Sequence, residues 1–307
     1  MSAPGLPTVV VALGGNALLP RGASLEAGAE HAAARRAARL LAPVTETARL
    51  VVTHGNGPQV GLLALMNDAY TAVEAYPLDV LGAETEGELG YIIEMELDNA
   101  VGDRDTVAIV TRTEVSGRDP AFEHPTKFIG PVYEEAAARA LSDKLGWTVR
   151  PDGDAWRRVV PSPEPLRILQ LPAIAQLVES DFLVVCAGGG GVPVVLGDDG
   201  SYSGVEAVID KDLASSLLAC DLGAAALVLA TDVDGVYERY GAPDARRLDA
   251  VTPAVLRAGS YAAGSMGPKV EAACRFVERT GGRAAIGALD DVGELVAGRT
   301  GTQVRPG

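Results

Sequence analysis

Lysine, histidine, cysteine and aromatic residues are all scarce in this 307-residue sequence. It contains three histidines, three cysteines and 5% aromatic residues, and only 4 of its 26 basic residues are lysine, the other 22 being arginine. Positive charge is also in deficit, since the net charge is −15. A chain with this charge is not expected to offer a general surface for nucleic acid or for an anionic membrane, so neither is predicted as a partner.

The scarcity of cysteine and histidine disfavours several kinds of site. Cys186, Cys220 and Cys274 are widely spaced and lack metal-ligand spacing, which predicts free thiols in a reducing, cytoplasmic compartment. His31 is expected on a helix surface, and no G-x-S-x-G or H-E-x-x-H motif is present. Hydrolase and metalloprotease mechanisms are therefore not favoured, and no metal-binding residue is predicted.

Long hydrophobic segments that would direct export or span a membrane are not predicted either. The start, MSAPGLPTVVVALGG, has no basic segment typical of a signal peptide and continues directly into a strand pattern. The uncharged stretch 182–197 is interrupted by GGGGVP and is too short to cross a bilayer. We therefore expect a cytoplasmic protein.

Buried strands alternate with helices along most of the chain, which predicts an α/β fold with a mostly parallel sheet covered by helices. Residues 116–165 interrupt this alternation and are rich in proline, glycine and aromatic residues, so we expect them to form a small inserted subdomain. In such sheets ligands bind beyond the carboxyl ends of the strands. Apolar, β-branched runs that predict strands lie within residues 8–13, 49–61, 105–115, 181–195, 225–238 and 283–289.

Four glycine-rich loops follow these strands or begin a helix. Glycine lets the backbone approach an anion and point several N–H groups at it. Their spacing does not match G-x-G-x-x-G, no lysine follows a glycine as in a Walker A loop, and the protein-kinase motifs are absent. The loops therefore predict phosphate binding without either common nucleotide motif. They are GGN at 14–16, HGNGPQVG at 54–61, AGGGGVP at 187–193 and GSMGPK at 264–269.

Three of the four lysines occupy unusual positions. Lys127 and Lys269 lie close to glycine and proline in the sequence, and Lys211 lies between two aspartates. Lysine is a compact point charge on a flexible stem, whereas arginine is a wide, rigid fork, so a site that follows a small moving anion favours lysine. Lys144 lies on a plain helical stretch, where no functional role is expected.

The sequence SMGPKVEAACRFVERTGG predicts a helix that starts near Pro268 and ends at glycines 281 and 282. Lys269 then lies in the first turn, where a cation is unfavourable for the helix dipole. Because helix amino termini bind phosphate, a functional role explains this lysine better than a structural one. The residues leave two alternatives open elsewhere: His54 either orients its loop or has no role, and TDVDGVYE at 231–238 is either a plain turn or part of a nucleotide site.

An acceptor that is already an anion, such as a carboxylate or carbamate, needs no general base. Phosphoryl transfer to it depends on positioning and on positive charge around the moving group. From the residues alone, the sequence predicts a phosphoryl transferase with an α/β fold.

The motifs together resemble the amino acid kinase superfamily and, within it, the carbamate kinase family, over nearly the whole chain. The blocks that carry the resemblance are VVVALGGNALL, VVTHGNGPQVGLL, DPAFEHPTKFIGPVY, WRRVVPSPEP, AGGGGVPVV, GVEAVIDKDLAS, TDVDGVY and GSMGPKVEAA. The most specific are PTKFIGP and GSMGPKVEA. Relatives such as acetylglutamate kinase carry a lysine in the first glycine loop, and ALGGN has none, which implies that Lys127 of the inserted subdomain reaches over the site instead.

The resemblance implies a three-layer αβα sandwich with two lobes, usually a homodimer. It implies an amino lobe at 1–200 that binds the small anion and carries the inserted lid at about 116–165, and a carboxyl lobe at 201–307 that binds the nucleotide. The implied reaction is the reversible conversion of ATP and carbamate to ADP and carbamoyl phosphate with Mg²⁺, used for ATP formation in arginine or related nitrogen catabolism.

The expected catalytic residues are Lys127, Lys211, Asp212 and Lys269. The role of Lys127 is implied by the resemblance, whereas for the others the segment VIDKDLAS leads to a hypothesis: Lys211 holds nucleotide phosphate oxygens from one side, Lys269 contacts the transferring group from the other, and Asp212 with Asp210 keeps both ammonium groups charged and oriented. The glycine loops and the nucleotide residues are implied by the resemblance. Phe128 stands where the family pattern has proline, which affects the expected lid conformation. The expected small-anion and phosphate site comprises Gly14, Gly15, Asn16, Gly55, Asn56, Gly57, Gly188, Gly189, Gly190 and Gly191. The expected nucleotide site comprises Asp210, Thr231, Asp232, Tyr237 and Met266.

Two alternatives compete with this function. One is another small-acid kinase of the same superfamily, which the inserted PTKFIGP segment and the lysine-free first loop disfavour. The other is a non-catalytic nucleotide sensor with the same fold, which the three lysines of an otherwise arginine-rich chain disfavour.

Overall fold

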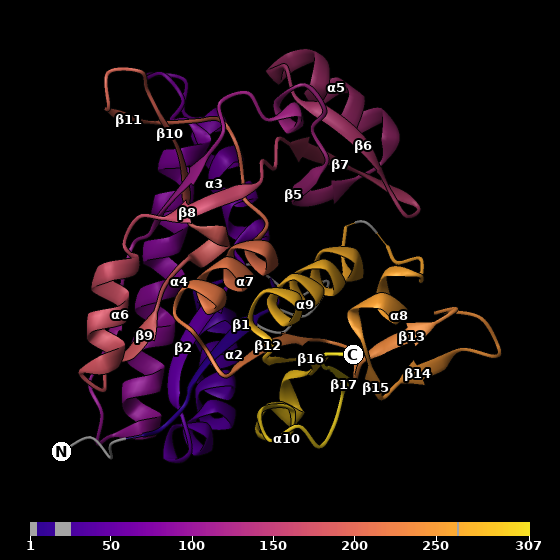
Figure 1. The fold of residues 1–307 in the computed structure, drawn as a ribbon. Coiled ribbons are helices and arrows are strands. Elements are labelled where there is room, and N and C mark those ends of the chain that lie inside the picture. The colour runs from indigo at the N-terminus through magenta and orange to yellow at the C-terminus, as the bar shows by residue number, and fades with distance from the viewer. Residues whose placement is uncertain (1–4, 16–25, 263) are drawn as a thin grey trace.

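The computed structural model describes residues 5–15, 26–262 and 264–307, and its centre is a sheet of eight strands (Figure 1). Six of the strands are parallel, whereas β15 and β17 run in the opposite direction. In spatial order the strands are β15 (Ala250–Val251), β17 (Thr302–Val304), β16 (Arg283–Ala288), β12 (Ala226–Thr231), β1 (Thr8–Leu13), β2 (Arg49–His54), β9 (Leu183–Val185) and β3 (Thr106–Ala108).

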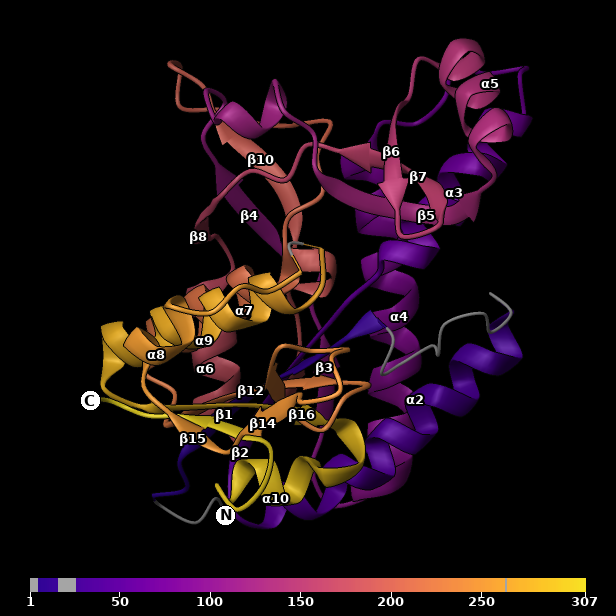
Figure 2. The same ribbon diagram turned by 90° about the vertical axis from the view of Figure 1, so that its right-hand side faces the viewer.

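Helices cover both faces of this sheet, as continuous apolar strands require. Along β1, Val9, Val11 and Leu13 pack on one face and Val10 and Ala12 on the other. Figure 2 shows α7, α8 and α9 on one side of the strands and α2 and α10 on the other. The first face is covered by α2 (Ala27–Leu41), α4 (Leu78–Val101) and α10 (Val292–Val296), and the second by α6 (Leu171–Glu179), α7 (Lys211–Asp221), α8 (Pro253–Arg257) and α9 (Met266–Thr280).

Smaller sheets extend from this sandwich. One has the order β11 (Tyr202–Gly204), β10 (Val192–Leu196), β4 (Arg112–Val115) and β8 (Pro165–Ile168), and a hairpin joins β13 (Val236–Glu238) to β14 (Arg246–Leu248). The other helices of the described residues are α3 (Gly57–Ala69) and the short η1 (Ala42–Glu46), η2 (Pro120–Phe122), η3 (Gly188–Gly190) and η4 (Leu289–Asp291).

A small subdomain protrudes above α9 at the top of Figure 1. Its antiparallel sheet has the order β5 (Lys127–Tyr133), β7 (Ala155–Val160) and β6 (Thr148–Asp152), and α5 (Glu135–Leu145) packs against it. Arg158 lies over the ring of Trp147, and Arg139 over that of Trp156, which stabilises this small unit. We call residues 127–160 the lid subdomain.

The predicted fold class is confirmed: a three-layer αβα sandwich with a mostly parallel sheet and a protruding inserted subdomain. One predicted strand is wrong in detail. Residues 105–115 form two strands, because the chain leaves the central sheet after β3 and β4 then pairs with β10. Among the described residues, no helix has both the length and the apolar character needed to cross a bilayer.

Candidate active site

Three lysines and two aspartates meet at the amino-terminal end of α7. Lys127, the first residue of β5, places Nζ 2.5 Å from Oδ2 of Asp210. Nζ of Lys211 lies 2.5 Å from Oδ1 of Asp212, and Nζ of Lys269 lies 3.0 Å from the other oxygen of that carboxylate. The cluster therefore joins the lid subdomain, α7 and the first turn of α9. We call these five residues the lysine cluster.

Asp210 is the N-cap of α7. Its Oδ1 accepts hydrogen bonds from the backbone N–H groups of Asp212 at 2.9 Å and Leu213 at 3.3 Å. These groups have no carbonyl partner within the helix, so the cap stabilises the helix start. Because Oδ2 of the same carboxylate contacts Lys127, one side chain fixes both the helix and the lid lysine.

Burial and charge oppose each other in the lysine cluster. Lys211 is only 7% exposed, and burial lowers its pKa although Asp212 partly offsets this effect. Burial also disfavours the charged forms of Asp212 and Lys269. For these two residues the ion pairs prevail, raising the pKa of Lys269 and holding the pKa of the Asp212 carboxyl well below its usual range. Asp212 and Lys269 are therefore charged at neutral pH.

The first two glycine loops adjoin the lysine cluster. Gly14 and Gly15 follow β1 directly, and Gly55 follows β2. A Cβ atom at Gly55 would lie 3.1 Å from the backbone nitrogen of Gly15 and 3.5 Å from Cε of Lys211, so a larger residue there would push the first glycine loop away by a few tenths of an ångström. Asn16 lies outside the described residues.

The third glycine loop closes over the second. A Cβ atom at Gly189 would lie 2.3 Å from the side-chain amide of Asn56, and one at Gly190 would lie 2.8 Å from Ile209. Asn56 is buried as the N-cap of α3, beside Gly57, and its Nδ2 donates to Oγ1 of Thr85 at 2.8 Å. The turn also requires left-handed backbone at three positions, Gly189 (φ 63°), Gly190 (φ 93°) and Gly191 (φ 84°).

The residues predicted for the nucleotide are more scattered. Thr231 ends β12, and its Oγ1 donates to Oδ1 of Asp232 at 3.1 Å. Asp232 is near enough to Lys269 to help raise the pKa of that lysine. Met266 begins α9, whereas Tyr237 lies on β13 and donates its hydroxyl hydrogen to Asp234 at 2.9 Å.

Besides the ion pair of Lys127 with Asp210, two close backbone or side-chain approaches hold the lid subdomain over this region. The ring of Phe128 lies 3.4 Å from where a Cβ atom of Gly264 would stand, so the lid touches the fourth glycine loop. Gly61 of α3 crosses Gly130 of β5 so closely that a Cβ atom at Gly61 would lie 1.9 Å from Cα of Gly130. Helix α3 begins at the second glycine loop and therefore supports the strand that carries Lys127.

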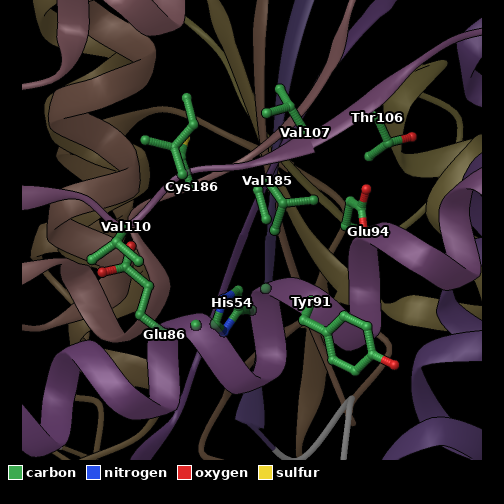
Figure 3. Close-up of a pocket in the computed structure, with 13 residues that line it drawn as sticks. His54, Glu86, Tyr91, Glu94, Thr106, Val107, Val110, Val185 and Cys186 are labelled. Carbon is green, nitrogen blue, oxygen red and sulfur yellow. The ribbon is translucent and has the colours of Figure 1, made fainter.

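A pocket of about 360 Å³ lies between α4 and β3, next to the second and third glycine loops (Figure 3). Its lining includes His54, Glu86, Tyr91, Glu94 and Cys186. A second pocket, of about 660 Å³, lies beside β14 and β15. None of the three clustered lysines lines either pocket, so the charged cluster rather than a cavity identifies the centre of the site.

Glu86 was missed by the sequence analysis. It is 2% exposed, and its Oε1 accepts a hydrogen bond from the backbone N–H of Gly188 at 2.9 Å. Burial raises the pKa of Glu86 from its ordinary 4.5 to about 8. The available signal was its place on the apolar stripe of α4 beside Leu81 and Leu89, where a glutamate is unexpected.

Both the sequence and the fold of this chain are similar to those of known proteins. Residues 7–287 match the amino acid kinase family. The carbamate kinase of Rhizobium meliloti (strain 1021) is 51% identical over 297 residues, which cover 96% of this chain and 92% of that protein. The carbamate kinase from Giardia lamblia bound to citric acid has a TM-score of 0.91 at 37% identity, covering 98% and 99% of the two chains. The same enzyme bound to AMP-PNP has a TM-score of 0.88 at 38% identity, with the same coverage.

The fold and the lysine cluster, together with these relatives, define a phosphotransferase of the α/β class. The chain belongs to the amino acid kinase family and, within it, to the carbamate kinases.

Proposed function

We propose that this protein transfers a phosphoryl group reversibly between ATP and carbamate, forming ADP and carbamoyl phosphate. The observation that carries the proposal is the lysine cluster, in which three ammonium groups converge next to three glycine loops. The carbamate kinases of similar sequence support the choice of carbamate as the acceptor.

The proposed roles follow from the contacts. Lys211 and Lys269, held by one carboxylate, neutralise charge on the nucleotide phosphates and on the transferring group from two sides. Lys127 reaches the same place from the lid subdomain. Asp210 and Asp212 orient the three ammonium groups. The backbone N–H groups that bind the small anion and the moving phosphoryl group are other N–H groups of the glycine loops, because those of Gly14, Gly55, Gly188, Gly190 and Gly191 already donate to internal acceptors.

Carbamate is already an anion, so its oxygen attacks the γ-phosphorus of ATP without a general base. The bond from that phosphorus to the ADP oxygen breaks as the new one forms, and the extra negative charge passes to ADP. The protein then accelerates the reaction by aligning the carbamate oxygen with the γ-phosphorus and by placing fixed positive charge around the transferring group in a partly desolvated site.

We infer that Mg²⁺ accompanies the nucleotide. Among the described residues, no group of three or more histidine, cysteine, aspartate or glutamate side chains is arranged to hold a metal ion. This fits an ion held mainly by phosphate oxygens and water, as Mg²⁺ commonly is in kinases. Its contribution would be to offset charge on the β- and γ-phosphates.

We also propose that the two lobes bind different substrates. Residues 1–200 bind the small anion, and residues 201–307 bind the nucleotide near Thr231, Asp232, Tyr237 and Met266. The proximity of Asp232 to Lys269 supports this arrangement. The AMP-PNP complex of the Giardia lamblia enzyme supports ATP as the nucleotide.

A homodimer formed through strand β3 is a further part of the proposal. Strand β3 is the last strand of the central sheet, and the neighbouring Tyr91 and Val110 are exposed. An unpaired apolar sheet edge is suited to pairing with a second copy. Light scattering that gives the mass of a single chain at micromolar concentration would contradict this part.

We place the protein in the cytoplasm, in arginine or related nitrogen catabolism. The three free cysteines support a reducing compartment. The favoured direction in that setting is ATP formation.

One coupled assay tests the activity. We expect ATP to form from ADP and carbamoyl phosphate with Mg²⁺, and little product from acetylglutamyl phosphate or with UDP. Equal or better turnover of either alternative would favour another small-acid kinase. Nucleotide binding without turnover of any acyl phosphate would favour a nucleotide sensor.

A further inference from the structure

Glu86 and His54 are buried together beside the pocket, and neither takes part in the proposed phosphoryl transfer. The exposed fraction is 2% for Glu86 and zero for His54. Both flank one point of the third glycine loop: a Cβ atom at Gly188 would lie 2.5 Å from Nε2 of His54 and 2.9 Å from Cγ of Glu86. Figure 3 shows the two side chains in the lining of the pocket.

Each side chain has one atom bound and one atom without a partner. Oε1 of Glu86 accepts from the N–H of Gly188, whereas Oε2 is buried and makes no hydrogen bond of normal geometry, although Thr111 lies near enough to this carboxyl group to oppose part of the rise in its pKa that burial causes. Nδ1 of His54 lies 3.4 Å from the carbonyl oxygen of Gly55, and Nε2 is buried and unpaired. Unpaired buried polar atoms are costly, so a pair of them on neighbouring side chains indicates a missing interaction.

The hydrogen-bonding capacities of the two atoms are complementary. A carbonyl oxygen only accepts, so Nδ1 of His54 carries the hydrogen and Nε2 of the neutral ring is an acceptor. A protonated carboxyl group of Glu86 would supply the matching O–H donor. We expect the two atoms to be joined through one water molecule or after a rotation of the carboxyl group, since both side chains line the same pocket of about 360 Å³.

We propose that Glu86 and His54 are positioning residues that share one proton and tie the second and third glycine loops together, with Glu86 present as a neutral carboxylic acid. His54 then orients the loop at Gly55, and Glu86 orients the loop at Gly188. This inference rests on the proposed function, because it assigns the two loops to the carbamate and phosphoryl site.

Loss of the shared proton has a predictable effect. A buried carboxylate at Glu86 would stand directly behind the loop at Gly188, so its negative charge would repel an anion bound to that loop. The binding-competent form would decrease as Glu86 ionises. The KM for carbamoyl phosphate should therefore rise with pH, whereas the KM for ADP, which binds on the other lobe, should change little.

Other titratable groups face the same region and have to be separated from Glu86. On α4 these are Tyr91 and Glu94, after β9 it is Cys186, and on α7 it is Lys211, which acts on His54. Burial lowers the pKa of His54 to about 4 and raises that of Cys186, so both are neutral between pH 7 and 9. Lys211 also has to be separated from Glu86, because burial lowers its pKa from the ordinary 10.5.

The experiment compares pH profiles of the wild type and E86Q in the ADP plus carbamoyl phosphate assay. Glutamine keeps the acceptor for Gly188 and a donor for His54, but it does not titrate. With the pKa of Glu86 at about 8, the wild-type KM for carbamoyl phosphate should rise about tenfold between pH 7 and 9, because the competent fraction falls by that factor. In E86Q this KM should stay nearly constant, and kcat at pH 7 should be close to that of the wild type.

The matched control is E94Q, which replaces another carboxyl group of the same pocket and should keep the wild-type profile. An equal rise of KM in E86Q would assign the titration to Lys211 and overturn the inference, as would a flat wild-type profile. Absence of activity at every pH would instead overturn the proposed function. If E86Q does not fold, ¹³C-carboxyl NMR of the wild type decides, since the inference requires one buried glutamate to titrate above pH 7.

Discussion

At the scale of single residues, the choice of lysine over arginine carries the most information. Three of the four lysines lie within one cluster, and the fourth, Lys144, is exposed near the end of α5. The sequence indicated these three positions because arginine is the usual cation of this chain. It did not reveal Glu86, because whether a helical glutamate is buried depends on elements that are distant in sequence.

Replacing Lys211 by arginine should abolish most of the activity while leaving the fold intact. Lys211 is buried between Asp212 and the backbone of Gly55, where a planar guanidinium does not fit. We expect kcat to fall about a hundredfold, nearly as far as in K211A, since removing one preorganised charge commonly costs about 3 kcal/mol.

The assay for this prediction is ATP formation from carbamoyl phosphate, together with the melting temperature. K144R is the control and should behave as the wild type. Near-normal turnover of K211R would mean that Lys211 acts as a generic cation.

At the scale of elements, the lid subdomain connects the two ends of the site. Its strand β5 carries Lys127, its Phe128 touches the loop at Gly264, and its Gly130 rests on α3. The inserted segment was predicted from its composition, but the contact with α3 was not, because two glycines give no sequence signal for meeting each other. The division of residues 105–115 into two strands was also missed, since the strands that pair with β4, namely β8 and β10, lie about 55 and 80 residues further along the chain.

Lys127→Ala should reduce turnover much more than nucleotide affinity. The ammonium group approaches the lysine cluster from the lid subdomain, with 29% of the side chain exposed, so it is placed to follow the transferring group rather than to anchor ADP. The measurements are kcat and the Kd of ADP by calorimetry, with K144A as the control. A large loss of ADP binding at unchanged kcat would contradict this role.

Gly61→Ala should displace the lid subdomain. The new methyl group would stand 1.9 Å from Cα of Gly130, which forces backbone to move and costs about 1–3 kcal/mol by overpacking. We expect a lower melting temperature and a kcat reduced like that of K127A, with ADP affinity retained.

A matched control for this variant is Gly82→Ala. Gly82 also lies in a helix, but a Cβ atom there would meet nothing within 4 Å, so alanine should be neutral or slightly stabilising. Full activity of G61A would show that Lys127 does not depend on the glycine crossing.

At the scale of the whole molecule, the fold class could be predicted because apolar strands and helices alternate regularly. The order of the eight strands could not, since strands such as β1 and β12 are similarly apolar and only the packed structure decides which become neighbours. The global charge of −15 also gave no hint of a local cluster of three cations.

The pH dependence of stability should reveal Glu86 through a comparison with E86Q. The pKa of Glu86 is about 8 in the folded protein and 4.5 ordinarily, so between these values the folded state holds a proton that the unfolded chain has released. Stability from this group is thus complete below pH 4.5 and is lost as pH rises towards 8, by at most about 1.4 kcal/mol per pH unit.

The melting temperature of the wild type should therefore fall relative to E86Q from pH 5 to pH 8 and remain parallel to it above that range. Thermal unfolding at half-unit pH intervals measures this difference. A constant difference across the range would mean that Glu86 titrates normally.

The lysine cluster also affects which anions can bind, because its ammonium groups are already paired with carboxylates of the same chain. Without substrate, the three ammonium groups form ion pairs with Asp210 and Asp212. Because these carboxylates belong to the same chain, their effective concentration at the lysines is high. A single inorganic anion would have to displace a tethered carboxylate and would gain little by doing so. If the cluster binds nucleotide as proposed, a polyphosphate that contacts several lysines at once would share them with the aspartates and gain more than a single inorganic anion does, so the aspartates would weaken binding of inorganic anions relative to that of the nucleotide.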